Sequence, residues 1–104
     1  MRYGIIRHRL IERDLLEITD YIASYAGLAA GKAKVEQITE FISRLADDPK
    51  IGSLREELRP GLRAIPVAEK AVVCFTVDDE TRTIFIIGIS YAGSDWNARV
   101  KERQ

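Results

Sequence analysis

The chain has 104 residues, of which 46% are hydrophobic and 31% are charged, a composition typical of a soluble globular domain. Sixteen Lys and Arg balance sixteen Asp and Glu, and the signs also balance within residues 1–60 and within residues 61–104. Because proteins that neutralise many phosphates carry a basic footprint, this balance argues against direct, sequence-specific binding to nucleic acid.

Cysteine content and hydropathy exclude further classes of protein. The one cysteine, Cys74, excludes an internal disulfide framework and leaves no cysteine pair for a zinc site. We expect neither a metal nor another cofactor. No apolar run reaches the roughly 20 residues that span a membrane, and the first ten residues lack the apolar core of a signal peptide. We therefore expect a cytoplasmic protein that does not contact membranes.

The first half of the chain predicts a strand followed by two helices. Residues 3–7 are short and apolar, as in a strand. Apolar residues recur at steps of three and four through residues 11–25 and from about residue 29 or 30 to residue 46, which predicts two amphipathic helices. Acidic and basic residues, Asp14 among them, are expected to cover the outer side of the first helix. Gly27 fits its C-cap, and the short link favours antiparallel packing.

From residue 62 onward the apolar period changes to two, which predicts strands. The expected strands are residues 62–67, 70–77 and 82–90. Pro66 suggests an edge strand or a bulge, whereas the last strand is apolar on both faces and should be central.

Two short segments flank these strands. Ser53 and Glu56 fit a capping box, so residues 53–58 are a candidate turn of helix. Ser94 or Asp95 fits the cap of a short helix near the carboxyl terminus, and residues from about 97 to 104 form a polar tail.

The resulting element order is β-α-α-β-β-β. A helical hairpin packed on one face of a mainly antiparallel sheet is the simplest way to bury both apolar stripes. We therefore predict a single α+β domain over residues 1–104.

Isolated reactive side chains give weak indications of chemistry. His8 lies among arginines and is expected to be a surface histidine. Cys74 lies among apolar residues and is expected to be a buried, inert thiol. The acidic run Asp78, Asp79 and Glu80 is expected at a solvated hairpin turn.

Two kinds of functional site remain open on these residues. Metal-independent RNA cleavage needs cations and proton-transfer groups, and Arg63, Lys70 and Tyr91 are the residues of the sheet region that could converge to supply them. A binding surface is the alternative, because Tyr91 and Trp96 lie near a basic tail and aromatics with arginine are typical interface anchors. Trp96 could equally pack the tail onto the sheet. The first strand and the strand containing Pro66 also offer open edges.

The stretch LADDPKIG…EELRPGLR, together with ERDLLEITDYIASYAG and KAVVCFTVDDETRTIFIIGISYAGSDW, carries a family resemblance. Over about residues 3–96 the chain resembles the ParE branch of the RelE/ParE superfamily, the toxins of type II toxin–antitoxin systems, including those of plasmid stabilisation. RelE-like ribonucleases carry a cluster of Lys and Arg on the sheet. Here Val72 and Ala92–Gly93 stand where such cations are expected, which favours the ParE branch.

The resemblance implies a toxin that poisons DNA gyrase and is neutralised by a ParD-like antitoxin. ParE-like members have no agreed catalytic set, so the resemblance transfers none. Arg63 matches the arginine of the PGLR segment, and Arg63, Tyr91 and Trp96 are the predicted contacts to a target or partner. The alternatives are a RelE-like, ribosome-dependent mRNA endoribonuclease using Arg63, Lys70 and Tyr91, and a non-toxic remnant that only binds an antitoxin.

Overall fold

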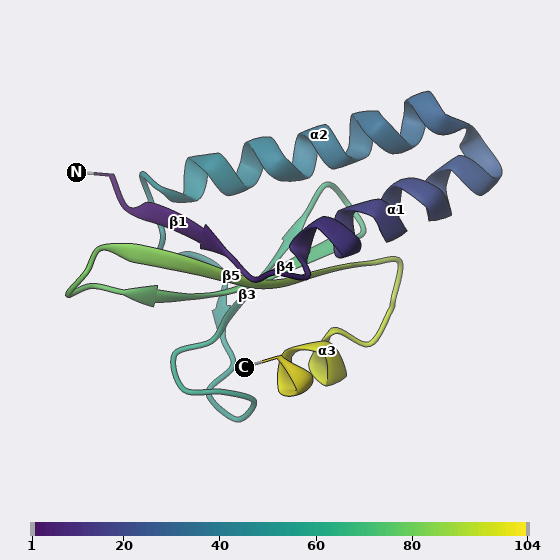
Figure 1. Cartoon of the computed structure of the whole chain (residues 1–104). Coiled ribbons are helices and arrows are strands. Elements are labelled where there is room, and N and C mark those ends of the chain that lie inside the picture. The colour runs from purple at the N-terminus through teal and green to yellow at the C-terminus, as the bar shows by residue number, and fades with distance from the viewer. Residues whose placement is uncertain (1, 104) are drawn as a thin grey trace.

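The computed structural model of the chain describes residues 2–103. A hairpin of two helices covers one face of a five-stranded sheet, and a short third helix lies on the other face (Figure 1). In chain order the elements are β1 (Gly4–Arg7), α1 (Ile11–Ala26), α2 (Leu28–Leu45), β2 (Ser53–Leu54), β3 (Arg63–Val67), β4 (Ala71–Asp78), β5 (Thr83–Tyr91) and α3 (Trp96–Glu102). The predicted α+β class and the helical hairpin on the sheet are therefore confirmed.

The sheet has the strand order β1-β5-β4-β3-β2. β1 runs parallel to β5, and the other neighbouring strands are antiparallel. β5 lies inside the sheet, between β1 and β4, as its two apolar faces predicted.

Two glycines shape the helical hairpin. Gly27 ends α1 with φ of +94°, a conformation that glycine adopts without steric cost, and this lets the chain reverse within one residue. Gly31 lies against α1 so closely that a Cβ at this position would be 2.6 Å from the carbonyl oxygen of Thr19. The two helices can therefore approach closely enough to bury one continuous apolar surface on the sheet. Its fully buried helical residues are Ile11, Ile38, Ile42 and Leu45.

The side chains of β5 divide between two clusters, and a bulge interrupts the strand. Cys74 pairs with Gly88 but Phe75 pairs with Ile86, so Ile87 is the extra residue on β5. Ile86 packs in the cluster under α1 and α2, whereas Ile87 packs in the second cluster, under α3. Consecutive residues of a strand point to opposite faces, so Ile86 and Ile87 are both fully buried because helices cover both faces of the sheet.

The predicted turn of helix at residues 53–58 is wrong. Ser53 and Leu54 instead form β2, which pairs with the first two residues of β3. Gly52 makes this pairing possible, because a Cβ there would lie 2.7 Å from the carbonyl oxygen of Ala64. Only two residues of β3 are covered, so Pro66 lies beyond the end of β2, at an open part of the edge, where its missing N–H is tolerated.

The carboxyl-terminal helix is present as predicted, with Asp95 as its cap. The Asp95 side chain accepts a hydrogen bond from the backbone N–H of Ala98. Although the sequence of this segment is polar, part of it packs against the rest of the chain, and Val100 and Arg103 are both buried. None of the helices among residues 2–103 is long and apolar enough to cross a membrane.

Candidate functional site

The structure separates one of the three candidate catalytic residues from the other two. Arg63 pairs across the sheet with Phe75, whereas Tyr91 pairs with Ala71, four residues further along β4. Four residues of a strand span roughly 13 Å. Lys70 and Tyr91 do line one pocket, so the structure brings these two together without Arg63.

Arg63 serves the connection between α2 and β2. It is half-buried at the start of β3, and its Nη1 donates a hydrogen bond of 3.4 Å to the carbonyl oxygen of Ile51. This contact fastens the loop that leads into β2.

Trp96 lies on the opposite face of the sheet from Tyr91. Its half-buried ring packs against the second cluster, and the Arg55 guanidinium lies 5.2 Å from the ring centroid in a cation–π contact. Arg63, Tyr91 and Trp96 therefore occupy three separate places, and Trp96 fastens α3 to the loop that follows β2.

Tyr91 belongs to a cluster of three tyrosines, which we call the tyrosine cluster. Its ring lies edge-on to Tyr21, with centroids 6.0 Å apart, and Tyr21 packs in the same way against Tyr25 at 5.6 Å. Tyr21 and Tyr25 remain 52% and 62% exposed. Burial raises the pKa of Tyr91, and its neighbours Tyr25 and Glu69 raise it further, so the phenol stays protonated at neutral pH.

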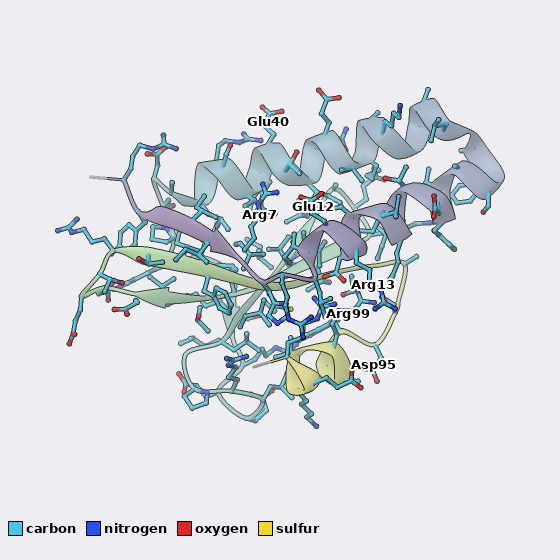
Figure 2. The ribbon with its side chains drawn as sticks, viewed as in Figure 1. Arg7, Glu12, Arg13, Glu40, Asp95 and Arg99 are labelled. Carbon is cyan, nitrogen blue, oxygen red and sulfur yellow. The ribbon has the colours of Figure 1, made fainter. Side chains whose placement is uncertain are left out.

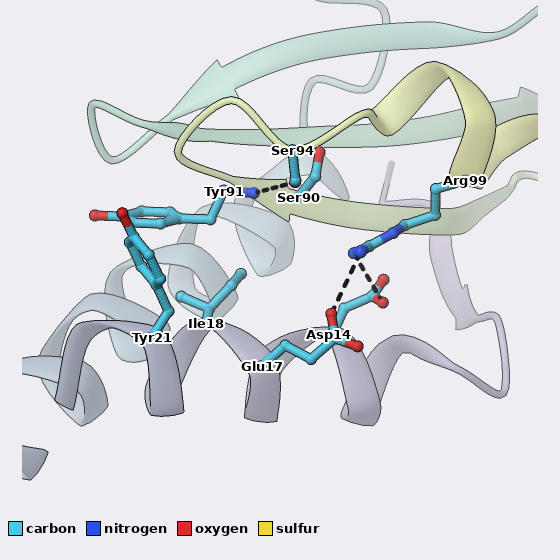
Figure 3. Close-up of a pocket in the computed structure, with 8 residues that line it drawn as sticks. All are labelled: Asp14, Glu17, Ile18, Tyr21, Ser90, Tyr91, Ser94 and Arg99. Carbon is cyan, nitrogen blue, oxygen red and sulfur yellow. Dashed lines mark hydrogen bonds and ion pairs between the residues drawn. The ribbon is translucent and has the colours of Figure 1, made fainter. Parts of the chain in front are cut away.

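A pocket of about 240 Å³ opens on one side of the tyrosine cluster, and we call it the Ser90 pocket (Figure 3). The residues that line it are Asp14, Glu17, Ile18, Tyr21, Ser90, Tyr91, Ser94 and Arg99. Ser90 is only 3% exposed, and its Oγ has no hydrogen-bond partner among the described residues. Ser94, by contrast, uses its Oγ to accept a hydrogen bond from the backbone N–H of Tyr91.

Asp14 stands at the inner end of this pocket and is 1% exposed. Its carboxylate accepts two hydrogen bonds from Arg103, at 2.6 and 2.7 Å, and one from Arg99 at 3.1 Å. A fourth comes from the backbone N–H of Ile89, at 3.0 Å. Gly88 makes room for the arginines, because a Cβ there would be 3.2 Å from Arg103 Nη1. One buried carboxylate thus joins α1, β5 and α3.

The expectation that Asp14 covers the outer side of the first helix is wrong. Asp14 follows Ile11 by three residues and precedes Ile18 by four, so it lies within the apolar stripe. Arg99 and Arg103 are four residues apart, at the end of α3 and just beyond it, which brings both to one side. These two spacings are the sequence signals that identify the network.

The cations near the Ser90 pocket are matched by carboxylates. Arg99 donates to Asp14 and, at 3.3 Å, to Glu17, which also pairs with Arg13 at 3.5 Å. Figure 2 shows Arg13 and Arg99 between α1 and α3, with Asp95 at the start of α3. The pocket therefore presents no cluster of free cations to a phosphate.

A second pocket of about 240 Å³ lies on the other side of the tyrosine cluster, and we call it the Lys70 pocket. Lys34 pairs there with Glu69 at 3.4 Å. Lys70 is exposed and has no carboxylate within salt-bridge distance among residues 2–103. In the same described part of the chain, no group of three or more His, Cys, Asp or Glu is arranged to hold a metal ion.

His8 and Cys74 contribute no reactive group. The expectation of a surface histidine is wrong: His8 is buried, and its Nδ1 accepts a hydrogen bond from the Leu10 N–H just before α1. Burial, helped by the nearby Arg103 and Arg9, lowers the pKa of His8. The prediction of a buried, inert thiol is confirmed, because burial raises the pKa of Cys74 to about 12.

Three solved structures share this fold. The chromosomal ParDE system from P. aeruginosa matches with a TM-score of 0.73 and 22% identity, over 88% of this chain and 97% of that one. The RelBE2 toxin–antitoxin complex from Mycobacterium tuberculosis matches with a TM-score of 0.60 and 21% identity, over 88% and 100%. A mutant of the E. coli toxin RelE in the free state matches with a TM-score of 0.65 and 16% identity, over 98% and 96%.

A hairpin of helices on this mixed sheet is therefore the fold of ParE and RelE toxins. No curated protein sequence matches this chain. The family model of the ParE toxin of the type II toxin–antitoxin system parDE matches residues 5–96. The chain belongs to that family, as the motifs in its sequence predicted.

Proposed function

We propose that this ParE-family toxin arrests growth by binding and poisoning DNA gyrase, without chemistry of its own, and that a ParD-like antitoxin neutralises it. The observation that carries the proposal is the lack of convergent cationic groups. Arg63 lies roughly 13 Å along the sheet from Lys70 and Tyr91. The arginine of the Ser90 pocket is already paired with carboxylates.

This charge arrangement supports binding over phosphodiester cleavage. A phosphorane transition state needs several donors directed at one point, with free charge to offset the developing negative charge. In the Lys70 pocket, Lys34 is compensated by Glu69, which leaves Lys70 and a protonated phenol. Those two groups can hold a phosphate or a carboxylate but lack a base for a 2′-hydroxyl.

Supercoiling by purified gyrase tests the proposal. The toxin at excess should reduce supercoiling and accumulate linear DNA after denaturation of gyrase, because poisoning traps the cleaved intermediate. The antitoxin encoded beside the toxin gene should restore supercoiling. Full gyrase activity at excess of folded toxin would contradict the proposed target.

The candidate contacts Arg63, Tyr91 and Trp96 can be separated in the same assay because they lie at three places. We expect Arg63→Ala or Trp96→Phe to reduce gyrase inhibition if the face of the toxin that carries the substituted residue contacts gyrase. Tyr91→Phe should leave inhibition unchanged, since it keeps the ring. If Tyr91→Phe alone abolishes toxicity while Trp96→Phe does not, the RelE-like ribonuclease becomes the better account.

A further inference from the structure

The buried ring of His8 lies where β1 meets α1, and its hydrogen bond requires a neutral imidazole. Its Nδ1 accepts the N–H of Leu10 at 3.1 Å, and the ring of Phe85 on β5 lies 6.2 Å away between centroids. The backbone of the same residue is fixed on both sides, because its N–H donates to the carbonyl of Ile86 and its carbonyl accepts the N–H of Ile11. A protonated imidazole has two N–H donors and no acceptor, so a charged His8 would lose the bond from Leu10.

The charged groups that face the ring also oppose its protonation. Arg103 follows α3, Arg9 precedes α1, and Arg59 lies in the loop between β2 and β3, and each of them disfavours a positive charge on the ring. Asp14 of α1 favours that charge. Burial is the main reason that the pKa of His8 lies below its ordinary value of 6.5, and the three arginines lower it further.

Asp14 is already occupied and compensates a further cation poorly. Its carboxylate accepts two hydrogen bonds from Arg103, one from Arg99 and one from a backbone N–H of β5. Arg99 also pairs with Glu17, whereas Arg103 is 8% exposed and has Asp14 as its carboxylate partner within residues 2–103. If His8 becomes charged, Arg103 is therefore the cation whose position is hardest to keep.

The end of α3 depends on Arg103 for its place on the sheet. Arg103 Nη1 donates to the carbonyl of Ile87 at 3.0 Å, and the carbonyl of Arg103 accepts a bond of 2.8 Å from Arg59. Beside it, Val100 packs on the second cluster, which contains the buried Cys74. A helix of seven residues is not stable in water by itself, so its last turn should fray when these contacts break and leave Cys74 accessible.

We propose that His8 is an acid-sensitive latch, whose protonation displaces Arg103 from Asp14 and frees the end of α3 from the apolar sheet face beneath it. The latch is closed above pH 6.5, where the ring is neutral in both the closed and the opened form. As the pH falls below 6.5, the opened form binds a proton that the closed form does not, and the equilibrium shifts toward the opened form. This inference does not depend on the target of the toxin.

The reactivity of Cys74 measures the opening, because the thiol lies under α3. Dithiodipyridine reacts with thiols in acid as well as at neutral pH, and the rate in the folded chain is divided by the rate in the chain unfolded in urea at the same pH. We expect this ratio to rise roughly tenfold between pH 7.5 and pH 5. A pKa of 6.5 in the opened form limits the rise to about thirtyfold.

His8→Asn is the matched control variant. The Oδ1 of an asparagine takes the place of Nδ1 and accepts the N–H two residues later, as in an Asx turn, but it does not titrate. The ratio for Cys74 should therefore change less than twofold over the same pH range. Equal pH dependence in His8→Asn and in the wild type would overturn the latch, because another group would then control the opening.

The proton resonances of the chain's one histidine report on the closed form directly. His8 should titrate below pH 6.5 in the wild type, and its pKa should move back toward 6.5 in Arg103→Gln, which lacks one opposing charge and the tether of α3. In that variant Cys74 should react faster than in the wild type at pH 7.5. Titration of His8 at or above pH 6.5 in the wild type would contradict the latch. Loss of circular dichroism in step with the thiol reaction would also contradict it, since the whole chain would then be unfolding.

Discussion

At the scale of single residues, Asp14 has the largest structural role of the charged side chains. Its two oxygens receive donors from three segments that are distant in sequence: a backbone N–H of β5 and the side chains of Arg99 and Arg103. Removing one partner of a buried ion pair leaves the other charge uncompensated, which costs far more than losing a surface pair.

We predict that Asp14→Asn destabilises the fold by about 3 kcal/mol, because Arg103 would be buried without a carboxylate. Arg99 would retain Glu17, which limits the loss. Urea denaturation measures the free energy of unfolding. Asp20→Asn is the matched control on the same helix, at an exposed position, and should change stability by less than about 0.5 kcal/mol. Equal effects at both positions would contradict this role of Asp14.

Cys74 gives a pH dependence whose sign follows from its burial. Its pKa rises from 9.0 to about 12 on folding, so the unfolded chain loses the thiol proton first as the pH increases. The stability that the thiol contributes is complete below pH 9 and is lost between pH 9 and 12. Relative to Cys74→Ala, the wild type should lose about 1.4 kcal/mol more between pH 7 and pH 10. Identical pH profiles of the two proteins would contradict burial of the thiol.

At the scale of elements, the close approach of α1 and α2 overrides helix propensity. Alanine favours a helix interior by about 1 kcal/mol over glycine, so propensity alone predicts that Gly31→Ala stabilises the chain. The added Cβ would meet the Thr19 carbonyl oxygen at 2.6 Å, and backbone atoms yield less readily than a flexible side chain.

We therefore predict that Gly31→Ala destabilises the chain by about 1–3 kcal/mol, measured by thermal or urea unfolding. Ala33→Gly, at an exposed position of the same helix, should cost no more than about 1 kcal/mol through propensity alone. A more stable Gly31→Ala variant would show that the helices can separate without cost.

The second element with a specific prediction is α3, which Arg103 tethers to Asp14. Arg103→Gln should release the helix, shift the emission of Trp96, the chain's one tryptophan, to longer wavelength, and speed amide exchange in residues 96–102. Lys101→Gln, at an exposed position of α3, is the control and should leave both signals unchanged. Unchanged fluorescence in Arg103→Gln would mean that Trp96 and Val100 hold α3 without the tether.

Periodicity predicted the elements with long apolar patterns and missed features that depend on tertiary contacts. The two helices were predicted within a few residues of their ends, because each stripe repeats over several turns. β2 was missed because two residues are too few to show a periodic pattern of apolar side chains. Only their pairing with β3 makes them a strand. The Asp14 network was missed because its partners lie at least 75 residues away along the chain.

Of the residues that line the two pockets, the sequence singled out Lys70 and Tyr91 as candidate site residues, and it did not predict how they are arranged. Tyr91 was identified from its position after the last strand, but nothing in the sequence pattern placed Tyr21 and Tyr25 beside it. Their meeting depends on the register of β5 against β4 and on the packing of α1, which sequence spacing does not specify. Arg63 was grouped with Lys70 and Tyr91 because sequence spacing does not show how the strands are aligned in the sheet.

At the scale of the whole molecule, sixteen cations and sixteen anions are distributed so that the charges in the Ser90 pocket are paired. Such a surface gives little long-range attraction for nucleic acid and is suited to contacts with proteins. The mechanism that we propose, in which harm follows from binding, is consistent with this charge distribution in a member of the ParE family.

The integrity of cellular mRNA during growth arrest tests this central claim most directly. Cells that express the toxin without its antitoxin should stop dividing while primer extension on abundant transcripts finds no new 5′ ends. Translated mRNAs cut at defined codon positions within minutes of induction, and spared when Tyr91 is replaced by Phe, would contradict the account.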